Sequence, residues 1–430
     1  MDVDKSPLVF TESNGRPKLV YPTAGDASHL HFNEGEKMFL LCPGLGSQGK
    51  PNNNKDFKPK NSKKHARKET SSPDNIVKSV KSVKCLKSNE VQFDSEIVTF
   101  KTLSCALKPD QSNSPVLKKI EGRCSRGHKY AIGHELGKDK FLKIMDLCHD
   151  ELAAETLWSH SVIQPTQSRS STDVFCQSCS QTFKFKSGTL YNGLSMTKEK
   201  RSPYAVPIQV ASLNRILGNS NGKKYVFKRK GKQMYLSRGH LVARGDKIFK
   251  TEREATYFYA NTVPMWNTVN EGNWFIIEDY IRILSNEKKH PLHTWTGGFD
   301  VMELEDKPIF LGGDNKLPVP KILYKCVVDK KAEESICFLV VNNPYLKEGE
   351  FTSGVNYKKC KELEECNQIF PDHSVIKYGR MYCCGLKDFY RKNEKLLGLG
   401  EIEKFLNFKT MDLTKSHVVP VKRKQSKEKP

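Results

Sequence analysis

The sequence predicts an α+β protein in which a smaller β-rich N-terminal part precedes a larger mixed domain. Its 430 residues exceed the roughly 100–200 residues of a usual domain, and 37% of them are hydrophobic, enough for more than one core. Short strand-like segments dominate the first half of the chain. From about residue 186 strand-like and helix-like segments alternate.

The N-terminal part, residues 1–185, is expected to form a β-rich accessory domain held together by disulfides. Two short strand-like segments flank Asn14-Gly15, a strong hairpin signal. Further β-leaning segments lie at 37–44, 90–105 and 174–186. Between about 46 and 90 we expect a disordered basic loop, because residues 50–87 hold twelve Lys and Arg but only three Asp and Glu. This loop is either a solvated linker or a phosphate contact.

The larger domain is expected over residues 186–415, followed by a mobile basic tail at 416–430. Strand-like segments are expected at 188–196 and 223–237, and helices at 212–217, 251–260 and 273–286. The segments 309–313, 321–330 and 335–343 have the composition of buried strands.

The thirteen cysteines favour disulfides over a zinc site. Only one CxxC pair exists, Cys176 and Cys179, whereas a zinc ribbon needs two such pairs or a spaced histidine pair. Disulfides indicate an oxidising compartment, and the odd number leaves at least one thiol outside an internal bridge. The cysteines lead us to expect a secreted protein. Because the first residues lack the pattern of a signal peptide, this sequence would then be a processed or truncated form. No apolar run is long enough to predict a membrane span.

The charge predicts a polyanionic partner. Lys and Arg number 71 against 49 Asp and Glu, a formal net charge of +22. Nucleic acid fits best, because binding a polyanion releases its counterions. An anionic membrane or a heparin-like partner would explain the charge alone. The sequence does not determine an oligomeric state.

The most informative segment runs from Tyr235 to Glu278. It contains Ser-Arg-Gly-His at 237–240, and a second copy of this tetrapeptide at 125–128 shows how little four residues mean alone. Only the copy at 237–240 is followed by Asn261, Asn270 and Glu278. Together these side chains offer what phosphodiester hydrolysis requires. His240 is a base near neutral pH, Arg238 can bind phosphate oxygens, and Asn270 and Glu278 are hard oxygen ligands suited to Mg²⁺. If 270–284 is one helix, Asn270 and Glu278 lie near one side of it.

This segment resembles the active-site region of the DNA/RNA non-specific endonucleases, most closely the secreted and salivary insect branch. That family has an Arg-Gly-His motif on a strand, followed by an Asn, a second Asn nine residues later within an NxGxW-type segment, and a Glu after eight more. Asn261, Asn270 and Glu278 reproduce both intervals, and the segment 270–274 reads NEGNW. The resemblance implies a ββα-metal nuclease domain with a mixed sheet core.

The resemblance also implies roles for individual residues. His240 is the general base, Arg238 the arginine of the motif, and Asn270 the direct Mg²⁺ ligand, for which Mn²⁺ can substitute. Asn261 orients the base and the phosphate, and Glu278 positions water near the metal. The family's upstream transition-state arginine matches Arg201, with Arg215 as the rival. Two residues depart from the usual pattern: Ser237 stands in place of an Asp, and Met265 replaces a frequent Gln.

Each residue also has an ordinary structural interpretation. A lone histidine after glycine is usually a surface residue, Asn270 could begin a helix, and Glu278 could lie on a solvated face. The two matched intervals together with the charge favour the functional interpretation.

A basic cluster precedes the motif and is expected to contact phosphates, although it could be a solvated edge strand. It consists of Lys223, Lys224, Lys228, Arg229, Lys230 and Lys232. The sequence thus predicts a metal-dependent endonuclease of low sequence specificity that hydrolyses DNA and RNA and binds them mainly through phosphates. The alternative is a salivary protein that binds nucleic acid with high affinity and has weak or no nuclease turnover.

Overall fold

The computed structural model describes most of the chain. The described residues are 8–22, 30–41, 57–58, 80–86, 90–93, 96–99, 104–105, 114–137, 140–165 and 183–416, with short gaps at 192, 199, 219, 230–231, 314, 348, 354–356 and 398–399. The expected basic loop falls almost entirely outside these residues, as do the CxxC pair and nearly all of the basic tail.

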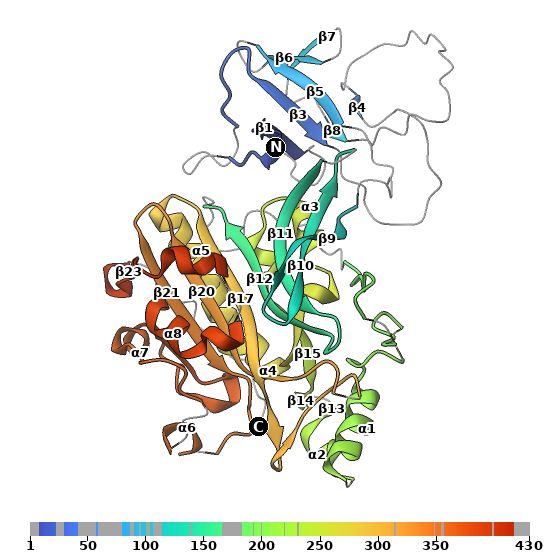
Figure 1. The fold of residues 1–430 in the computed structure, drawn as a ribbon, viewed down its shortest axis with the longest axis vertical. Coiled ribbons are helices and arrows are strands. Elements are labelled where there is room, and N and C mark those ends of the chain that lie inside the picture. The colour runs from blue at the N-terminus through green and yellow to red at the C-terminus, as the bar shows by residue number, and fades with distance from the viewer. Residues whose placement is uncertain are drawn as a thin grey trace. The chain divides into compact units, whose positions relative to one another are not determined.

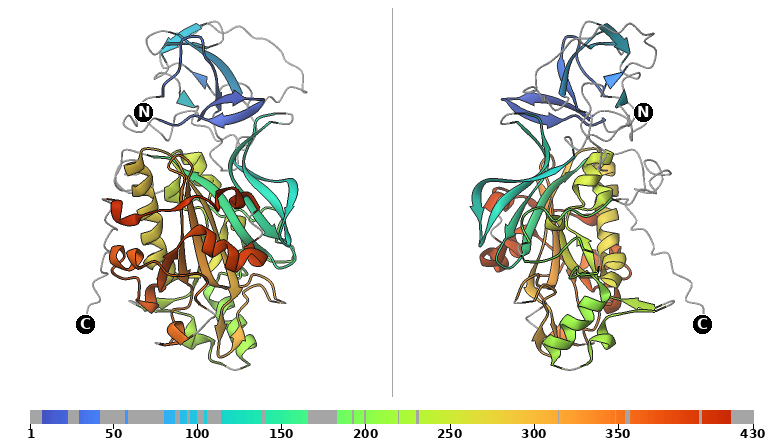
Figure 2. Two further views of the ribbon diagram at one scale, coloured as in Figure 1. Left: turned by 60° about the vertical axis from the view of Figure 1, so that its left-hand side comes forward. Right: turned by 90° about the vertical axis from the view of Figure 1, so that its right-hand side faces the viewer.

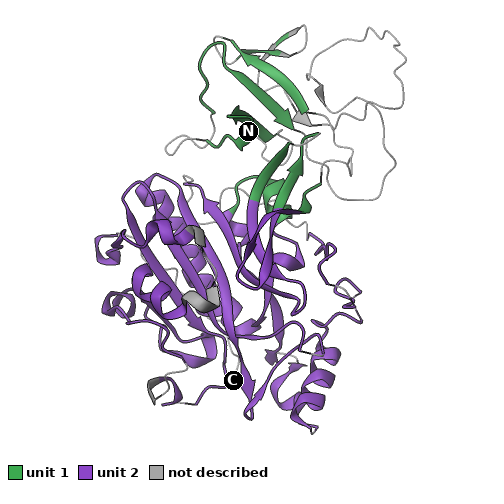
Figure 3. Ribbon diagram, viewed as in Figure 1, with its two compact units in different colours: residues 1–118, 132–144, 247–255 green, residues 119–131, 145–246, 256–430 purple. Residues whose placement is uncertain are grey.

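The chain forms two compact units (Figure 3). Unit 1 comprises residues 1–118, 132–144 and 247–255, and unit 2 comprises 119–131, 145–246 and 256–430. The sequence suggested a boundary at residue 185, whereas much of the segment 119–163 belongs to unit 2. The reason is strand pairing: Glu155–Ile163 runs antiparallel to Leu292–Val301, from Trp158 opposite Gly297 to Ile163 opposite Leu292.

Unit 1 is built on a six-stranded sheet. Its expected hairpin is confirmed: β1 (Leu8–Ser13) pairs with β2 (Arg16–Leu19), and Asn14 and Gly15 have positive φ values of 50° and 72°. The strand order is β2-β1-β3-β5-β6-β7. The other strands are β3 (Lys37–Leu41), β5 (Val80–Cys85), β6 (Glu90–Phe93) and β7 (Glu96–Thr99), with β4 (Phe57–Lys58) paired to β8 (Ser104–Cys105).

Most of the larger, nine-stranded sheet belongs to unit 2, and parts of β9, β10 and β11 belong to unit 1 (Figure 1). Its order is β22-β21-β20-β17-β12-β11-β10-β9, with β23 parallel to β21. The strands are β9 (Val116–Cys124), β10 (Gly127–Glu135), β11 (Phe141–Asp150), β12 (Glu155–Ile163), β17 (Leu292–Val301), β20 (Pro320–Asp329), β21 (Glu334–Val341), β22 (Met381–Cys384) and β23 (Lys409–Thr410). β20 and β21 confirm the buried strands expected at 321–330 and 335–343. Residues 188–196 and 309–313 were expected to be strands and instead form turns and bends, apart from one isolated bridge at Phe310.

The two faces of this sheet have different coverings. Side chains alternate along a strand, so Tyr324 and Cys326 of β20 point to one face and Lys325 to the other. On the first face an apolar core includes Tyr324, Cys326 and Phe389 of α8 (Leu386–Leu397). On the second face, Lys325 bonds the carbonyl of Leu241. The sheet therefore carries an apolar core on one side and the candidate site on the other. Figure 2 shows the ribbon of this sheet in two further views.

A ββα unit lies on this second face. β15 (Leu236–His240) pairs antiparallel with β16 (Thr262–Trp266), and α4 (Asn267–Val269) and α5 (Phe275–Lys288) follow. The single helix expected over 270–284 is interrupted. Gly272 has non-helical backbone angles within the π-turn Asn270–Trp274, and a side chain there would meet the carbonyl oxygen of Tyr378 at 2.6 Å.

The remaining elements are short. They are α1 (Val206–Leu217), α2 (Gly222–Tyr225), β13 (Phe227–Arg229), β14 (Lys232–Met234), α3 (Lys250–Ala255), β18 (Glu303–Leu304), β19 (Lys307–Pro308), α6 (Glu350–Ser353) and α7 (Glu364–Ile369), with 3-10 turns at Arg244–Asp246, Tyr259–Asn261, Ile376–Tyr378, Gly400–Phe405 and Leu413–Lys415. Within the described residues, no helix has the length and apolar character needed to span a membrane.

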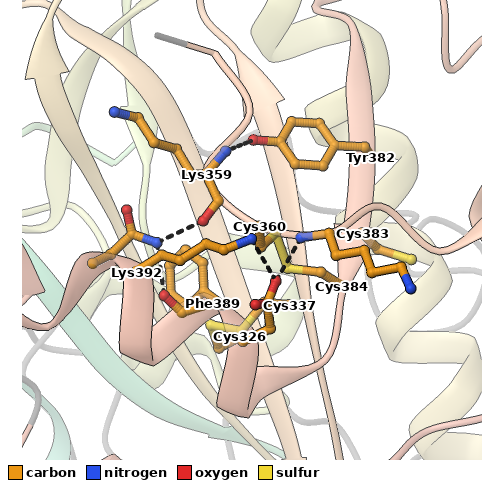
Figure 4. Close-up of a disulfide and its surroundings, with 12 residues drawn as sticks. Cys326, Cys337, Lys359, Cys360, Tyr382, Cys383, Cys384, Phe389 and Lys392 are labelled. Atoms are coloured by element: carbon orange, nitrogen blue, oxygen red, sulfur yellow. Dashed lines mark hydrogen bonds and ion pairs between the residues drawn. A yellow bond between two sulfur atoms is a disulfide. The ribbon is translucent and has the colours of Figure 1, made fainter. Parts of the chain in front are cut away.

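The disulfide expectation is confirmed. Four bridges join described cysteines: Cys124 to Cys148, Cys326 to Cys337, Cys360 to Cys384, and Cys366 to Cys383. Figure 4 shows the region where Cys326, Cys337, Cys360 and Cys384 pack near Phe389. Cys85 is the free thiol among the described residues.

Candidate active site

The hairpin β15–β16 displays the Arg-Gly-His motif. Gly239 lies opposite Val263, and a Cβ at this position would come within 2.5 Å of Met265 Cε and 2.7 Å of Met265 Cβ. The glycine of the motif therefore lets the Met265 side chain pack directly across β15. Arg238 and His240 then project to the same face of the strand, one pleat apart.

His240 is a neutral base held in an aromatic environment. Its pKa is lowered to about 4, chiefly by burial; the nearby Asp246 opposes this shift, and Arg244 and Arg238 contribute to it. Its ring lies 5.4 Å from Phe185 and 5.1 Å from Tyr257, measured between ring centroids. The Nε2 atom is buried without a hydrogen-bond partner. At neutral pH this nitrogen can accept a proton.

Arg238 is positioned by aromatic rings instead of carboxylates. Its guanidinium lies 5.2 Å from the ring centre of Phe185, 5.4 Å from that of Tyr204 and 5.6 Å from that of Tyr259. Arg238 Nε donates to the Tyr259 hydroxyl at 3.2 Å, and that hydroxyl donates to the Met196 carbonyl at 2.6 Å. The rings fix the arginine without neutralising it, so its charge remains available to an anion.

Asn270 is oriented by the serine of the motif. Its Nδ2 donates to Ser237 Oγ at 3.3 Å, and Ser237 Oγ donates to the Met265 carbonyl at 2.9 Å. With the amide nitrogen engaged, the Asn270 Oδ1 atom is left as an oxygen donor. Ser237 thus performs a positioning function at the position where many family members have an Asp.

Glu278 belongs to a buried network of charges. Its pKa is raised to about 7, chiefly by burial; Lys325 and Arg282 oppose this shift and Asp246 contributes to it. Asp246 accepts a hydrogen bond from Arg282 Nη1 at 3.1 Å and lies 3.9 Å from Lys325 Nζ. Trp274 joins the network to the base, because its indole Nε1 donates to the His240 carbonyl at 3.4 Å.

The donor set fits a hard divalent cation. Asn270 supplies a free amide oxygen, and Glu278 is a carboxylate whose buried charge a cation would stabilise. In the described part of the chain no three His, Cys, Asp or Glu side chains form a metal-binding group. A metal here would therefore have few protein ligands and would keep several waters, which is the preference of Mg²⁺.

Asn261 was expected to orient the base and the phosphate, but its side chain is surrounded by backbone atoms. It is fully buried, its Oδ1 accepts from Val242 N at 3.0 Å, and its Nδ2 donates to the carbonyls of Val242 at 2.9 Å and Thr256 at 3.0 Å. These bonds use both ends of the amide, so the side chain has no donor left for a phosphate. In this arrangement Asn261 fixes the backbone directly after His240 and acts as a positioning residue.

The two candidate upstream arginines lie at one cleft. Arg201 and Arg215 are both exposed, and both line a cleft of about 400 Å³ beside α1. Neither of them has a described contact with His240 or Glu278. Arg201 is linked to the motif through the chain, because Tyr204, three residues later, contacts Arg238.

The basic cluster forms an exposed surface next to the motif. Part of it forms a short hairpin of β13 and β14, with Arg229 directly opposite Lys232. Like charges at directly opposed positions destabilise a hairpin, so this pairing favours a role in binding an anion. Lys223, Lys224, Lys228, Arg229 and Lys232 are exposed, and Lys230 lies outside the described residues. The first two belong to the short helix α2 and not to a strand.

Several residues of the site carry no local sequence signal. Phe185, Tyr257 and Tyr259 surround the base and the arginine, and hydrophobic patterning assigns such residues to a core. Lys325 is fully buried on β20, 85 residues after His240 in the chain. A lysine within an otherwise apolar strand is the one signal that could have identified it, since lysine is almost never buried without a specific partner.

Comparison with known proteins decides the family. The DNA/RNA non-specific endonuclease family matches residues 127–378, more than half of the chain. The chain belongs to the DNA/RNA non-specific endonuclease family.

Relatives place it in the insect salivary branch of these endonucleases. A salivary endonuclease of Lutzomyia longipalpis is 27% identical over 281 residues, covering 63% of this chain and 62% of the relative. The salivary protein Tsal2A of Glossina morsitans morsitans is 24% identical over 400 residues, covering 90% of this chain and 87% of the relative. The chain thus spans about three fifths of the Lutzomyia relative and most of the Glossina one. The family match and the relatives confirm the family expected from the Arg-Gly-His motif and its following intervals.

Proposed function

We propose that this chain is a secreted, metal-dependent endonuclease that hydrolyses phosphodiester bonds in DNA and RNA with little sequence preference. The observation that carries the proposal is the surrounding of His240, whose imidazole is neutral and whose buried Nε2 has no hydrogen-bond partner. Beside it lie the oxygen donors Asn270 and Glu278 and Arg238, which has no carboxylate partner among the described residues. Membership of the endonuclease family and the salivary relatives support it.

In the proposed reaction, His240 Nε2 accepts the proton of the attacking water. Arg238 binds a non-bridging oxygen of the phosphate and stabilises the charge that develops on it. Arg201 supplies a second positive charge from the edge of the cleft. A divalent metal, Mg²⁺ with Mn²⁺ as substitute, supplies Lewis acidity at the leaving oxygen when bound. Asn270 and Glu278 would hold it.

The basic hairpin provides the proposed substrate contact. Arg229, Lys232 and Lys228 face solvent on β13–β14, and contacts to phosphates carry no base information. Replacing all three by Gln should raise KM for long DNA at least tenfold at physiological salt and reduce the slope of log KM against log salt by about 2 to 3. A control triple variant of exposed residues elsewhere, Lys387, Arg391 and Lys404, changes the net charge equally and should leave that slope unchanged.

The deciding experiment is digestion of plasmid DNA and long double-stranded RNA with and without Mg²⁺, using the wild type and His240→Ala. Cleavage by the wild type alone, and only with metal, would support both the activity and the base assignment. If neither protein cuts while both retard nucleic acid in a gel, the chain is instead a nucleic-acid-binding protein without turnover. The uncompensated charge of the β13–β14 hairpin is the observation that favours this second function.

A further inference from the structure

A second feature of unit 2 lies next to the proposed reaction centre: the cleft beside α1. It is formed by the loop at 193–195, the segment 201–203, one side of α1 and the loop at 311–313. Its volume is about 400 Å³, which lies in the range of small-ligand sites.

The charged side chains that line the cleft are all positive. Arg201 and Arg215 are the charged residues that line it, and no carboxylate does. Within the described part of the chain neither arginine forms an ion pair. Other arginines of unit 2 do: Arg126 pairs with Asp150, and Arg282 with Asp246. Two unpaired guanidinium groups around one hollow form a site for an anion such as a phosphate.

The cleft also has an apolar lining and is shaped by glycines. Leu194, Ile208 and Leu311 line the cleft. A Cβ on Gly313 would lie 3.3 Å from Arg215 Nη2, and one on Gly312 would lie 3.1 Å from Leu194 Cδ1. The absence of side chains at Gly312 and Gly313 therefore lets Arg215 and Leu194 rest against the loop backbone. The result is an apolar wall beside a cation, complementary to a nucleotide with its flat base and its charged phosphate.

The cleft is connected to the reaction centre by a short piece of chain. Pro203 lines the cleft, and the next residue, Tyr204, is buried with its ring 5.4 Å from the Arg238 guanidinium. Tyr204 also stacks on Tyr259 at 5.9 Å between ring centroids. A strand whose phosphate lies at Arg238 and His240 would place a neighbouring nucleotide at the cleft.

We propose that this cleft holds one nucleotide of the substrate strand flanking the cut, with its phosphate on Arg215 and its base against Leu194 and Ile208. The inference rests on the proposed nuclease function and deepens it. It gives Arg215 a task in substrate binding distinct from stabilising the reacting phosphate.

The test compares two substrates: long duplex DNA, and bis(p-nitrophenyl) phosphate, a diester without flanking nucleotides. Three variants are used. Arg215→Ala removes the phosphate contact, Ala211→Trp fills the cleft from the exposed side of α1, and Arg391→Ala removes one exposed charge from α8 as the matched control.

Arg215→Ala and Ala211→Trp should each lower kcat/KM for DNA about tenfold more than kcat/KM for the small diester. Arg215→Ala should also reduce the slope of log KM against log salt by about 0.9, the value for one phosphate contact. Arg391→Ala should change neither quantity.

Two outcomes would overturn the inference. Equal losses on both substrates with Arg215→Ala would make Arg215 the transition-state arginine, and losses no larger than those of Arg391→Ala would leave the cleft without a substrate. Failure of the nuclease function itself is distinguishable, because the wild type would then cut neither substrate.

Discussion

The tetrapeptide Ser-Arg-Gly-His occurs twice in unit 2, and its two copies have opposite surroundings. At 125–128 it forms the turn between β9 and β10 and the start of β10, and Ser125 has a positive φ of 42°. There Arg126 is half exposed and pairs with Asp150 at 3.0 Å, and His128 lies 3.4 Å from Glu151. At 237–240 the same residues lie on β15 among aromatic rings.

The difference shows that the function of this tetrapeptide depends on whether carboxylates pair with its arginine. In the first copy Asp150 pairs with Arg126, and His128 lies beside Glu151, which leaves both residues to stabilise the start of a hairpin. In the second copy Phe185, Tyr204 and Tyr259 hold Arg238 without neutralising it. The identical letters therefore yield a structural turn in one place and a candidate reaction centre in the other.

The histidines give the largest expected contrast. His240→Ala should lower kcat by at least about a thousandfold, since it removes the proposed general base. His128→Ala should leave kcat within about twofold. Both are measured as initial rates of plasmid cleavage at saturating Mg²⁺, with binding followed by fluorescence anisotropy. Equal activity of the two variants would remove His240 from the mechanism.

The arginines should differ nearly as much. Arg238→Met keeps the packing among the rings but removes the charge, and it should lower kcat/KM about a hundredfold. Arg126→Met should leave kcat/KM unchanged and lower the free energy of unfolding by no more than about 1 kcal/mol, because its ion pairs are partly exposed. Denaturant unfolding of both variants separates the two effects. A loss of activity confined to Arg126→Met would reverse the assignment.

Acidity should act through Glu278 before it acts through His240. Burial raises the pKa of Glu278 to about 7, so below pH 7 a proton competes with the cation for this carboxylate. The Mg²⁺ concentration for half-maximal activity should rise about tenfold per pH unit between pH 7 and pH 5. Since the pKa of His240 is lowered to about 4, the imidazole stays neutral over this range, and kcat at saturating Mg²⁺ should hold.

Glu278→Gln provides the control for this pH experiment. It cannot titrate, so the half-maximal Mg²⁺ concentration should be higher than in the wild type but nearly independent of pH. If kcat at saturating Mg²⁺ instead falls with a midpoint near 6.5, the ordinary histidine value, His240 is not shielded by its surroundings.

The serines give the smallest contrast. Ser237→Ala removes the bond that orients Asn270 and should raise the half-maximal Mg²⁺ concentration about fivefold with little change in kcat. Ser125→Ala should have no such effect. Ser237→Asp restores the residue typical of the family and should recover the wild-type value. An unchanged metal requirement in Ser237→Ala would show that Asn270 needs no support.

Local patterns predicted much of this molecule from its sequence. Asn14-Gly15 identified a hairpin because few other residues tolerate two consecutive positive φ values. The apolar runs of β20 and β21 identified buried strands, and the matched intervals after His240 identified the ββα unit. Each of these signals lies within a short stretch of chain.

What the sequence did not predict depends on contacts between distant segments. Strand β12 joins the large sheet through β17, about 130 residues later, so the change in composition near residue 185 misplaced the boundary. Gly272 breaks the expected helix because Tyr378 approaches it. Lys325 enters the site from β20, and Asn261 is satisfied by backbone atoms that the sequence does not place beside it.

The adjacent cysteines of β22 protect an edge of the large sheet from pairing with other chains. Neighbouring residues of a strand point to opposite faces, so Cys383 and Cys384 anchor β22 from both sides, to Cys366 and Cys360. The enclosed segment also bonds the strand directly, with Leu363 N donating to the Cys383 carbonyl at 2.9 Å. β22 is the outermost strand of its sheet, and such strands are where other chains add and aggregation begins. The two disulfides hold the 360–366 segment against β22, so the backbone groups at this edge of the sheet stay covered. Reduction of these bridges should therefore expose an aggregation-prone edge strand before the core unfolds.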